Sequence, residues 1–368
     1  MSGIEAQQTA LNAICPYFTM FPLDFPRRIL TRHARVGQRV LDPFCGRGTT
    51  NFAARLTGLD TLGVDSNPVA VAITAAKLAK SNVRAVIWSA QRILSDVREA
   101  PVPTGEFWER AYHPSVLRKI CRLRAGLLQD CRSNARIVLR GIVLGALHGP
   151  LGIHTPSYFS NQSTRTYAPK PAYAVKYWRA HRMLPPKVKV LAVIRRRAER
   201  YLSAKLPACD ATSTLGDSRD EDVFAGAGFQ MGFDWIITSP PYYGMRTYLQ
   251  DQWLRNWFLG GSEAVDYSTN GQLEHMNPEF FGAQLSQVWA NVADSANDDA
   301  RLVIRFGGIR DRNVNPVDLI RASLQDAGWR VSTIRDAGSA DSGKRQADFF
   351  LTRRSEPITE CDVWANLA

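Results

Sequence analysis

The chain lacks the residue spacings that mark small metal sites and disulfide frameworks. Its six cysteines show no CxxC spacing, and its six histidines form no HxxxH pair. The sequence therefore predicts neither a structural zinc site nor disulfides, and we expect no bound metal. The glycine-rich loop described below is not followed by Lys-Ser or Lys-Thr, so the sequence does not predict a site for the triphosphate of ATP.

Long hydrophobic runs are also missing. No stretch approaches the length of a membrane span, and the N-terminal segment has neither the basic region nor the apolar core of a secretory signal. We expect a cytoplasmic protein on these grounds. The 368 residues, 45% of them hydrophobic, are enough for one large domain or two ordinary ones.

Acidic residues are scarce in one part of the chain. Residues 95–205 contain 21 Lys and Arg against 6 Asp and Glu, a charge of +15, whereas the whole chain carries +12 and the remainder therefore −3. A basic region of this kind suits a polyanion such as nucleic acid. A solvated basic face without a nucleic-acid partner is the alternative interpretation.

A glycine-rich loop follows an apolar run that ends at Asp42. It reads Asp-Pro-Phe-Cys-Gly-Arg-Gly-Thr-Thr and continues into a predicted helix from Asn51 to Leu56. Seventeen residues after Gly48, a second apolar run ends in Asp65, where an acid can accept hydrogen bonds from both hydroxyls of a ribose. This spacing is typical of a βαβ nucleotide site.

A second motif, Thr-Ser-Pro-Pro-Tyr, occupies residues 238–242 after another apolar run. Two consecutive prolines remove two backbone N–H donors, so the carbonyls around Ser239 are free to accept from an amino group. Tyr242 supplies a flat face for a base. The motif alone would equally fit a Pro-Pro turn after a buried strand, but the glycine loop upstream favours the functional interpretation.

Together these segments resemble the DNA amino methyltransferases that use S-adenosylmethionine, and the Ser-Pro-Pro-Tyr form is most similar to the N4-cytosine subgroup. The resemblance covers roughly residues 15–80 and 205–352 and implies that Ser239, Pro240, Pro241 and Tyr242 are catalytic. The cofactor-binding residues that it implies are Phe21, Asp42, Phe44, Gly46, Gly48, Thr49, Asp65, Asn67, Asp217 and Thr238.

The resemblance implies an α/β fold, a Rossmann-like doubly wound sheet with a basic, mainly helical insertion. We expect a cofactor-binding half at residues 1–94, the insertion at 95–205 and a catalytic half at 206–368. The cofactor motifs precede the catalytic motif, whereas many N4-cytosine enzymes run in the opposite order. The insertion also precedes Gly216-Asp217, which departs from the family group that shares this order.

The insertion carries the predicted DNA contacts. Residues 108–148 have the spacing of two helices, residues 155–177 interleave aromatic and basic side chains, and residues 195–197 are three arginines on a predicted helix. An aromatic loop that merely packs on the helices is the alternative for residues 155–177. The predicted nucleic-acid-binding residues are Arg165, Tyr167, Lys170, Lys176, Arg195, Arg196, Arg197 and Arg246.

In the last third, residues 251–259 predict an amphipathic helix, 301–306 a strand and 317–327 a helix. Residues 329–334 and 348–352 are expected to form a closing antiparallel pair. The stretch at 262–277 has the composition of a loop.

The sequence predicts methyl transfer to the N4 amine of a flipped cytosine in double-stranded DNA, in a restriction-modification or related defence or epigenetic context and with a possible cognate endonuclease. Three alternatives stay open: N6-adenine methylation of DNA, RNA guanine-N2 methylation, and an inactive DNA-binding subunit. Cytosine C5 methylation is disfavoured because that chemistry uses a cysteine after a proline, and no Pro-Cys dipeptide occurs.

Overall fold

The computed structural model describes residues 3–17, 21–149, 157–160, 171–224, 232–243, 252–265, 273, 277–307, 314–339 and 359–368. The chain divides into two compact units. The sheet unit comprises Thr19–Thr74, Pro207–Thr247 and Thr269–Ala368, and the helical unit comprises Met1–Phe18, Ala75–Leu206 and Tyr248–Ser268. Among the described residues, no helix is both long and apolar enough to cross a membrane.

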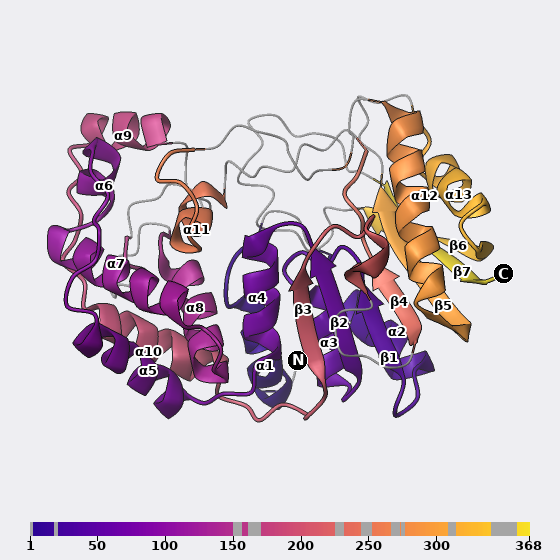
Figure 1. Ribbon diagram of the computed structural model, residues 1–368, viewed down its shortest axis with the longest axis horizontal. Coiled ribbons are helices and arrows are strands. Elements are labelled where there is room, and N and C mark those ends of the chain that lie inside the picture. Colours follow the sequence, from indigo (N-terminus) through magenta and orange to yellow (C-terminus); the bar gives the residue numbers. More distant parts are fainter. Residues whose placement is uncertain are drawn as a thin grey trace. The chain divides into compact units, whose positions relative to one another are not determined.

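The sheet unit is built on seven strands in the order β3-β2-β1-β4-β5-β7-β6 (Figure 1). Strands β1 to β5 pair in parallel, and β7 is antiparallel to both β5 and β6. The strands are β1 (Arg39–Asp42), β2 (Asp60–Asp65), β3 (Ala211–Leu215), β4 (Phe233–Thr238), β5 (Ala296–Gly307), β6 (Trp329–Ser339) and β7 (Thr359–Leu367). This confirms the predicted α/β doubly wound sheet, and the strand order reverses between β1 and β4, where such sheets bind ligands.

Both faces of the central strands are buried, as expected of a parallel sheet covered by helices. Neighbouring residues of one strand point to opposite faces, so Val40 and Leu41 belong to different hydrophobic clusters. One face packs against α2 (Asp24–His33) and α3 (Thr49–Leu56), and the other against α12 (Pro278–Asp294) and α13 (Pro316–Gln325).

Strand β6 begins where predicted and pairs antiparallel with β7. Its predicted partner, residues 348–352, lies outside the described part of the chain. A short 3₁₀ helix, η2 (Glu221–Val223), follows β3.

The helical unit contains most of the predicted basic insertion and confirms its mainly helical character. Its elements are α1 (Gly3–Thr9), the 3₁₀ helix η1 (Ala10–Ala13), α5 (Val83–Asp96), α6 (Glu106–Ala111), α7 (Pro114–Gln129), α8 (Asn134–Ala146), α9 (Pro171–Ala180), α10 (Val190–Tyr201) and α11 (Trp253–Phe258). Helix α5 packs against α7, α8 and α10, because its apolar face includes Val86, Ala90 and Ile93.

The observed units differ from the expected boundaries at 94/95 and 205/206. Helix α5 groups with the insertion rather than with the cofactor half, and so do residues 1–18 and the stretch that holds α11. Helix α4 (Pro68–Leu78) begins in the sheet unit and ends in the helical unit. The N-terminal segment joins the helical unit because buried residues such as Leu11 and Ile14 pack there, and η1 contacts α10.

Candidate active site

The glycine loop between β1 and α3 is held in a conformation that only glycine adopts readily. Gly46 has φ of 50° and Gly48 has φ of 69°, both in the left-handed region. A Cβ atom on Gly48 would lie 2.5 Å from the hydroxyl oxygen of Thr74. That hydroxyl donates to the Gly46 carbonyl at 3.1 Å. The loop therefore turns tightly and brings its backbone to the carboxyl end of β1.

Asp65, at the end of β2, closes the loop from the other side. One carboxylate oxygen accepts from the backbone N–H of Gly46 at 2.8 Å, and the other accepts from that of Asn67 at 2.8 Å. Burial raises the pKa of Asp65 to about 6, against the opposing effect of these two hydrogen bonds. Each oxygen keeps a further lone pair, so the geometry leaves room for the predicted hydrogen bond from a ribose hydroxyl, which stays a prediction.

Asp42 is the most unusual acid of the site. Its side chain is fully buried, and its Oδ1 accepts from the Thr238 hydroxyl at 2.6 Å and from the Phe44 N–H at 3.2 Å. Its Oδ2 has no hydrogen-bond partner among the described residues. Burial raises the pKa of Asp42 to about 7, although the bonds from Thr238 and Phe44 act in the opposite direction. A buried oxygen of this kind lacks the donor that a ligand could supply.

Thr238 links the two sequence motifs across the point where the strand order reverses. It is the last residue of β4, it is fully buried, and its hydroxyl bonds to Asp42 of β1. The Thr50 hydroxyl of α3 donates to the Ile237 carbonyl at 3.0 Å and ties the same two segments together. The Ser-Pro-Pro-Tyr motif therefore begins directly beside the glycine loop.

The Ser-Pro-Pro-Tyr motif then leaves strand β4. Ser239 is partly exposed, Pro240 is buried, and Pro241 and Tyr242 are partly exposed. The Tyr242 phenol donates to the Glu360 carboxylate at 2.7 Å, and its ring packs edge-on against Phe306, with 5.3 Å between ring centroids. Burial, followed by the charge of Glu360, raises the pKa of Tyr242 well above its usual range.

Glu360 is a site residue that the sequence did not reveal. It is buried in β7, where it pairs in register with Gly307 of β5, at the edge of the sheet where the parallel strands end. It lies 118 residues beyond Tyr242 in the chain. No local motif marks it, so only the pairing of β5 with β7 could have found it.

The remaining predicted cofactor residues lie in the same unit. Asp217 follows β3 and forms an ion pair with Arg219, which holds the pKa of that carboxyl below its usual range. The neighbouring Ser218 hydroxyl donates to the Pro43 carbonyl at 2.6 Å and joins this turn to the glycine loop.

The aromatic residues predicted at the cofactor site pack inside the sheet unit. Phe44 meets Trp289 of α12 edge-on, and Phe21 meets Phe25 of α2 in the same way. Thr49 is buried as the first residue of α3.

The predicted DNA contacts are described only in part. Arg165, Tyr167, Lys170 and Arg246 lie outside the described residues. Lys176 is exposed on α9, and Arg195 and Arg196 are exposed on α10.

Arg197 departs from the expectation of a phosphate contact. Its guanidinium is buried and donates to the carbonyls of Ser157, Ile14 and Gly145. It also lies over the Tyr158 ring, 5.0 Å from the centroid. The three arginines are consecutive, so the helix turns one of them inward while its neighbours face solvent. We therefore leave Arg197 out of the proposed DNA contacts.

These residues fit the cofactor that the motifs imply. S-adenosylmethionine combines a cationic amino-acid part, a ribose and an adenine. The unpartnered Oδ2 of Asp42 fits a donor or a positive charge, Asp65 fits the ribose hydroxyls, and the glycines at 46 and 48 allow close approach of the backbone. Across the described ranges, no cluster of three or more His, Cys, Asp or Glu side chains could hold a metal ion.

Comparison with known proteins gives matches of two kinds. Residues 4–76 match the family described as DNA methylase, which covers N4 and N6 amino methylation. The Type II methyltransferase M.MjaII of Methanocaldococcus jannaschii is 32% identical over 74 residues, which are 20% of this chain and only 14% of that protein. The family match includes the glycine loop and Asp65 but ends before the Ser-Pro-Pro-Tyr motif.

Solved structures align over most of the chain but at low similarity. The rRNA methyltransferase aviRa of Streptomyces viridochromogenes aligns with a TM-score of 0.38 and 12% identity, covering 100% of this chain and 94% of that one. A TehB-like S-adenosylmethionine-dependent methyltransferase of Corynebacterium glutamicum gives 0.32 and 11%, covering 92% and 85%. We base the fold on the strand order itself. The family match supports a DNA methyltransferase and implies S-adenosylmethionine as its cofactor.

Proposed function

We propose that this protein transfers a methyl group from S-adenosylmethionine to the exocyclic N4 amine of a cytosine in DNA. The hydrogen bond between Thr238 and Asp42 carries the proposal. It joins the Ser-Pro-Pro-Tyr motif to the glycine loop at the point where the strand order reverses, so that an amine held by one motif lies next to a cofactor held by the other.

Ser239 and the proline carbonyls have the chemistry to orient an amine. An amino group needs acceptors for its two hydrogens while its nitrogen lone pair is aimed at the methyl carbon. Ser239 is partly exposed, and the two prolines that follow donate no N–H to neighbouring carbonyls. Orientation at about 3 to 3.5 Å supplies much of the rate of such a transfer.

Tyr242 is proposed as the platform for the flipped base. Its phenol donates a hydrogen bond to Glu360, and its ring forms a T-shaped contact with Phe306. The ring therefore has a defined position before a base binds. Glu360 is therefore proposed as a positioning residue that acts through Tyr242.

The cofactor, when bound, supplies an activated methyl group. The chain's own contribution is to hold the amine and to exclude competing positions of the base. The extra proton of the methylated amine is acidic and passes to water, so the mechanism assigns no strong base to the protein.

DNA as substrate is supported by the family match and by the basic insertion. Lys176, Arg195 and Arg196 are exposed within it, and we propose that they contact phosphates, which position DNA without reading its sequence. Cytosine is favoured over adenine because the N6-adenine subgroup more often carries Asp or Asn where this chain has Ser239. A restriction-modification context and a cognate endonuclease are proposals from the resemblance alone.

The test is to identify the methylated nucleoside. Purified protein is incubated with isotopically labelled S-adenosylmethionine and either duplex DNA of mixed sequence or total tRNA, and digested products are analysed by mass spectrometry. The expected product is N4-methylcytosine from DNA, formed about a hundredfold more slowly by a matched Ser239→Ala protein. N6-methyladenine from DNA would show that the target base is adenine and not cytosine. Labelled guanine from tRNA would show that the substrate is RNA, and absence of label from any nucleic acid would overturn the proposed enzymatic activity.

A further inference from the structure

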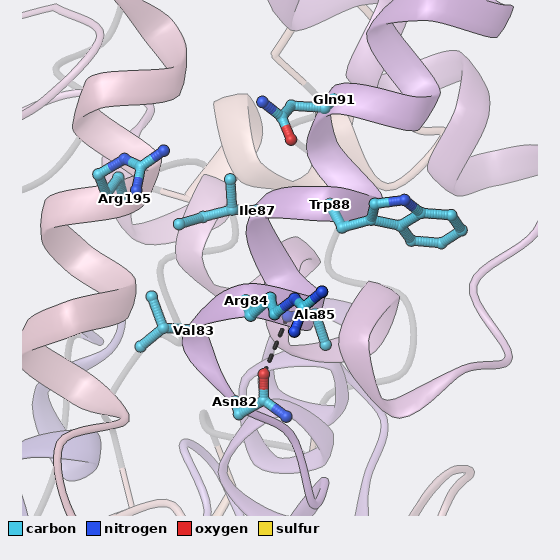
Figure 2. Close-up of a pocket in the computed structure, with 8 residues that line it drawn as sticks. All are labelled: Asn82, Val83, Arg84, Ala85, Ile87, Trp88, Gln91 and Arg195. Atoms are coloured by element: carbon cyan, nitrogen blue, oxygen red, sulfur yellow. Dashed lines mark hydrogen bonds between the residues drawn. The ribbon is translucent and has the colours of Figure 1, made fainter.

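The helical unit has a cavity of about 730 Å³ on its surface, formed by α5 together with Arg195 of α10. Figure 2 shows Arg195 reaching from α10 toward the face of α5 that carries Ile87, while Trp88 extends from the other side of α5 and Arg84 lies between them. The cavity is therefore a broad surface across α5, with a cation on one side and an indole on the other.

Trp88 is unusual among the tryptophans of this chain. Its side chain is 63% exposed, whereas seven of the other eight are at most 4% exposed and Trp364 is partly buried. The inner face of α5 is already filled by residues such as Val86 and Ile93. Tryptophan combines a large apolar ring with an N–H donor, and for this reason it is enriched at binding interfaces.

The polar groups around the indole determine what it could bind. Arg84 precedes Trp88 by four residues and Gln91 follows it by three, so all three share one face of the helix. No acidic residue lines the cavity. Within the described part of the chain, neither Arg84 nor Arg195 has a carboxylate partner, whereas the nearby Asp96 is already paired with Arg92 at 2.8 Å.

This combination suits a nucleic-acid strand better than a protein surface. Tryptophan and arginine also occur in protein interfaces, but no acidic residue lines this cavity, and Figure 2 shows Arg84 between Arg195 and the exposed indole of Trp88. Guanidinium groups bind phosphates, and an aromatic face stacks with any unpaired base. The side-chain amide of Gln91 adds a hydrogen-bond donor and an acceptor that could pair with the edge of a base.

We propose that Arg84, Trp88, Gln91 and Arg195 form a binding site for a single-stranded stretch of DNA, separate from the pocket for the methylated base. The two guanidinium groups hold phosphates, and Trp88 stacks on one unpaired base without strong sequence preference. The proposal rests on the proposed function in taking DNA as the substrate. None of the four residues is among those predicted at the catalytic motif or glycine loop.

The test measures binding of fluorescein-labelled dT15 to the full-length protein by anisotropy over a series of NaCl concentrations. Trp88→Ala is expected to weaken binding about tenfold, the scale of one lost base stack, and Trp88→Phe to retain most of the affinity. Arg84→Gln and Arg195→Gln are each expected to lower the slope of log affinity against log salt by about 0.7. Arg330→Gln, an exposed charge on β6, is the matched control and should leave both quantities unchanged.

Two measurements make the result decisive. Thermal unfolding of each variant confirms that the exposed substitutions leave the fold intact, and labelled methyl transfer by the parental protein tests the proposed function separately. Parental affinity for dT15 in Trp88→Ala would overturn the inference even if methyl transfer is observed. Tighter Trp88-dependent binding of rU15 than of dT15 would overturn the assignment to DNA, and a change in self-association without a change in dT15 binding would overturn it in favour of a second copy of the chain.

Discussion

The two carboxylate oxygens of Asp42 lie in different surroundings. Oδ1 accepts two hydrogen bonds, and Oδ2 is buried without a partner among the described residues. Burial of a charge with incomplete compensation favours the protonated form, which is why the pKa of Asp42 is raised to about 7. The ionised Asp42 carboxylate therefore lowers the stability of the folded protein, and a cationic ligand bound beside Oδ2 would reduce this cost.

We expect the cofactor-free protein to lose stability as the pH rises from about 4 to 7. The folded pKa of Asp42 lies above its unfolded value of 3.8, so the native state binds the extra proton in this range and ionisation on raising the pH disfavours it. Each pKa unit is worth about 1.4 kcal/mol, and the raised pKa of Asp65, about 6, acts in the same direction.

Urea unfolding at several pH values measures this slope. The Asp42→Asn variant should show a shallower fall, while Asp298→Asn, at an exposed position, serves as the control. An equal slope in the Asp42 variant and the parental protein would contradict the assignment to Asp42.

Ser239→Ala and Asp65→Ala are expected to fail in different ways. Loss of the Ser239 hydroxyl should lower the methyl-transfer rate by about a hundredfold with cofactor affinity retained, because Ser239 is the proposed acceptor for the amine. Loss of the Asp65 carboxylate should weaken cofactor binding, because it releases Gly46 and removes the proposed acceptor for the ribose. Calorimetric cofactor binding and single-turnover transfer distinguish the two; parental behaviour of both variants would show that the site is assigned wrongly.

At the scale of elements, the short turn from β1 into α3 sets the position of the cofactor loop. Gly48→Ala is expected to destabilise the protein by about 2 to 4 kcal/mol, through left-handed strain and the clash of the new Cβ with Thr74. Gly37→Ala is the matched control, since Gly37 has φ of 87° but nothing within 4 Å of its Cβ position. That variant should lose only about 1 kcal/mol.

Denaturant unfolding of both glycine variants measures the difference, and cofactor binding should fall in Gly48→Ala alone. Equal losses of stability would show that the Thr74 contact is relieved at no cost.

Local patterns predicted the elements around the cofactor loop because each is specified within a few residues. The helix expected from Asn51 is α3, and the apolar run before Asp65 is β2. Pairing over long sequence distances left no such signal. The pairing of β6 with β7 was not predicted, and Glu360 was missed, because both depend on β7 entering the sheet between β5 and β6.

On the scale of the whole molecule, composition predicted that positive charge is concentrated in the insertion. It did not predict which arginines of the insertion are buried and which face solvent. Whether an arginine on α10 faces solvent depends on what packs against each side of the helix. The buried Arg197 and the exposed Arg195 and Arg196 follow from contacts with η1, α5 and α8.

Neighbouring arginines of α10 should therefore give opposite phenotypes. Replacing Arg195 and Arg196 by Gln should flatten the salt dependence of duplex DNA binding, by about one unit of slope per lost phosphate contact, at unchanged stability. Arg197→Gln should instead destabilise the fold by about 3 kcal/mol, because two buried carbonyls and one partly buried carbonyl lose a charged donor. Anisotropy and urea titration report the two effects; an unchanged salt slope in the double variant would move the DNA contacts elsewhere.

Each of the two compact units is assembled from three separate stretches of chain. A gene fragment exchanged between positions 75 and 206 would carry α5 to α10 but leave behind η1 and α11. In the recombined protein, Ile14 and Arg255 would come from the recipient and Arg197 and Leu144 from the transferred fragment. The Ile14 carbonyl would have to accept a hydrogen bond from Arg197, and Arg255 would have to donate one to the Leu144 carbonyl. We therefore expect the proposed DNA contacts of the helical unit to change in evolution by substitutions on its exposed faces rather than by exchange of one continuous gene segment.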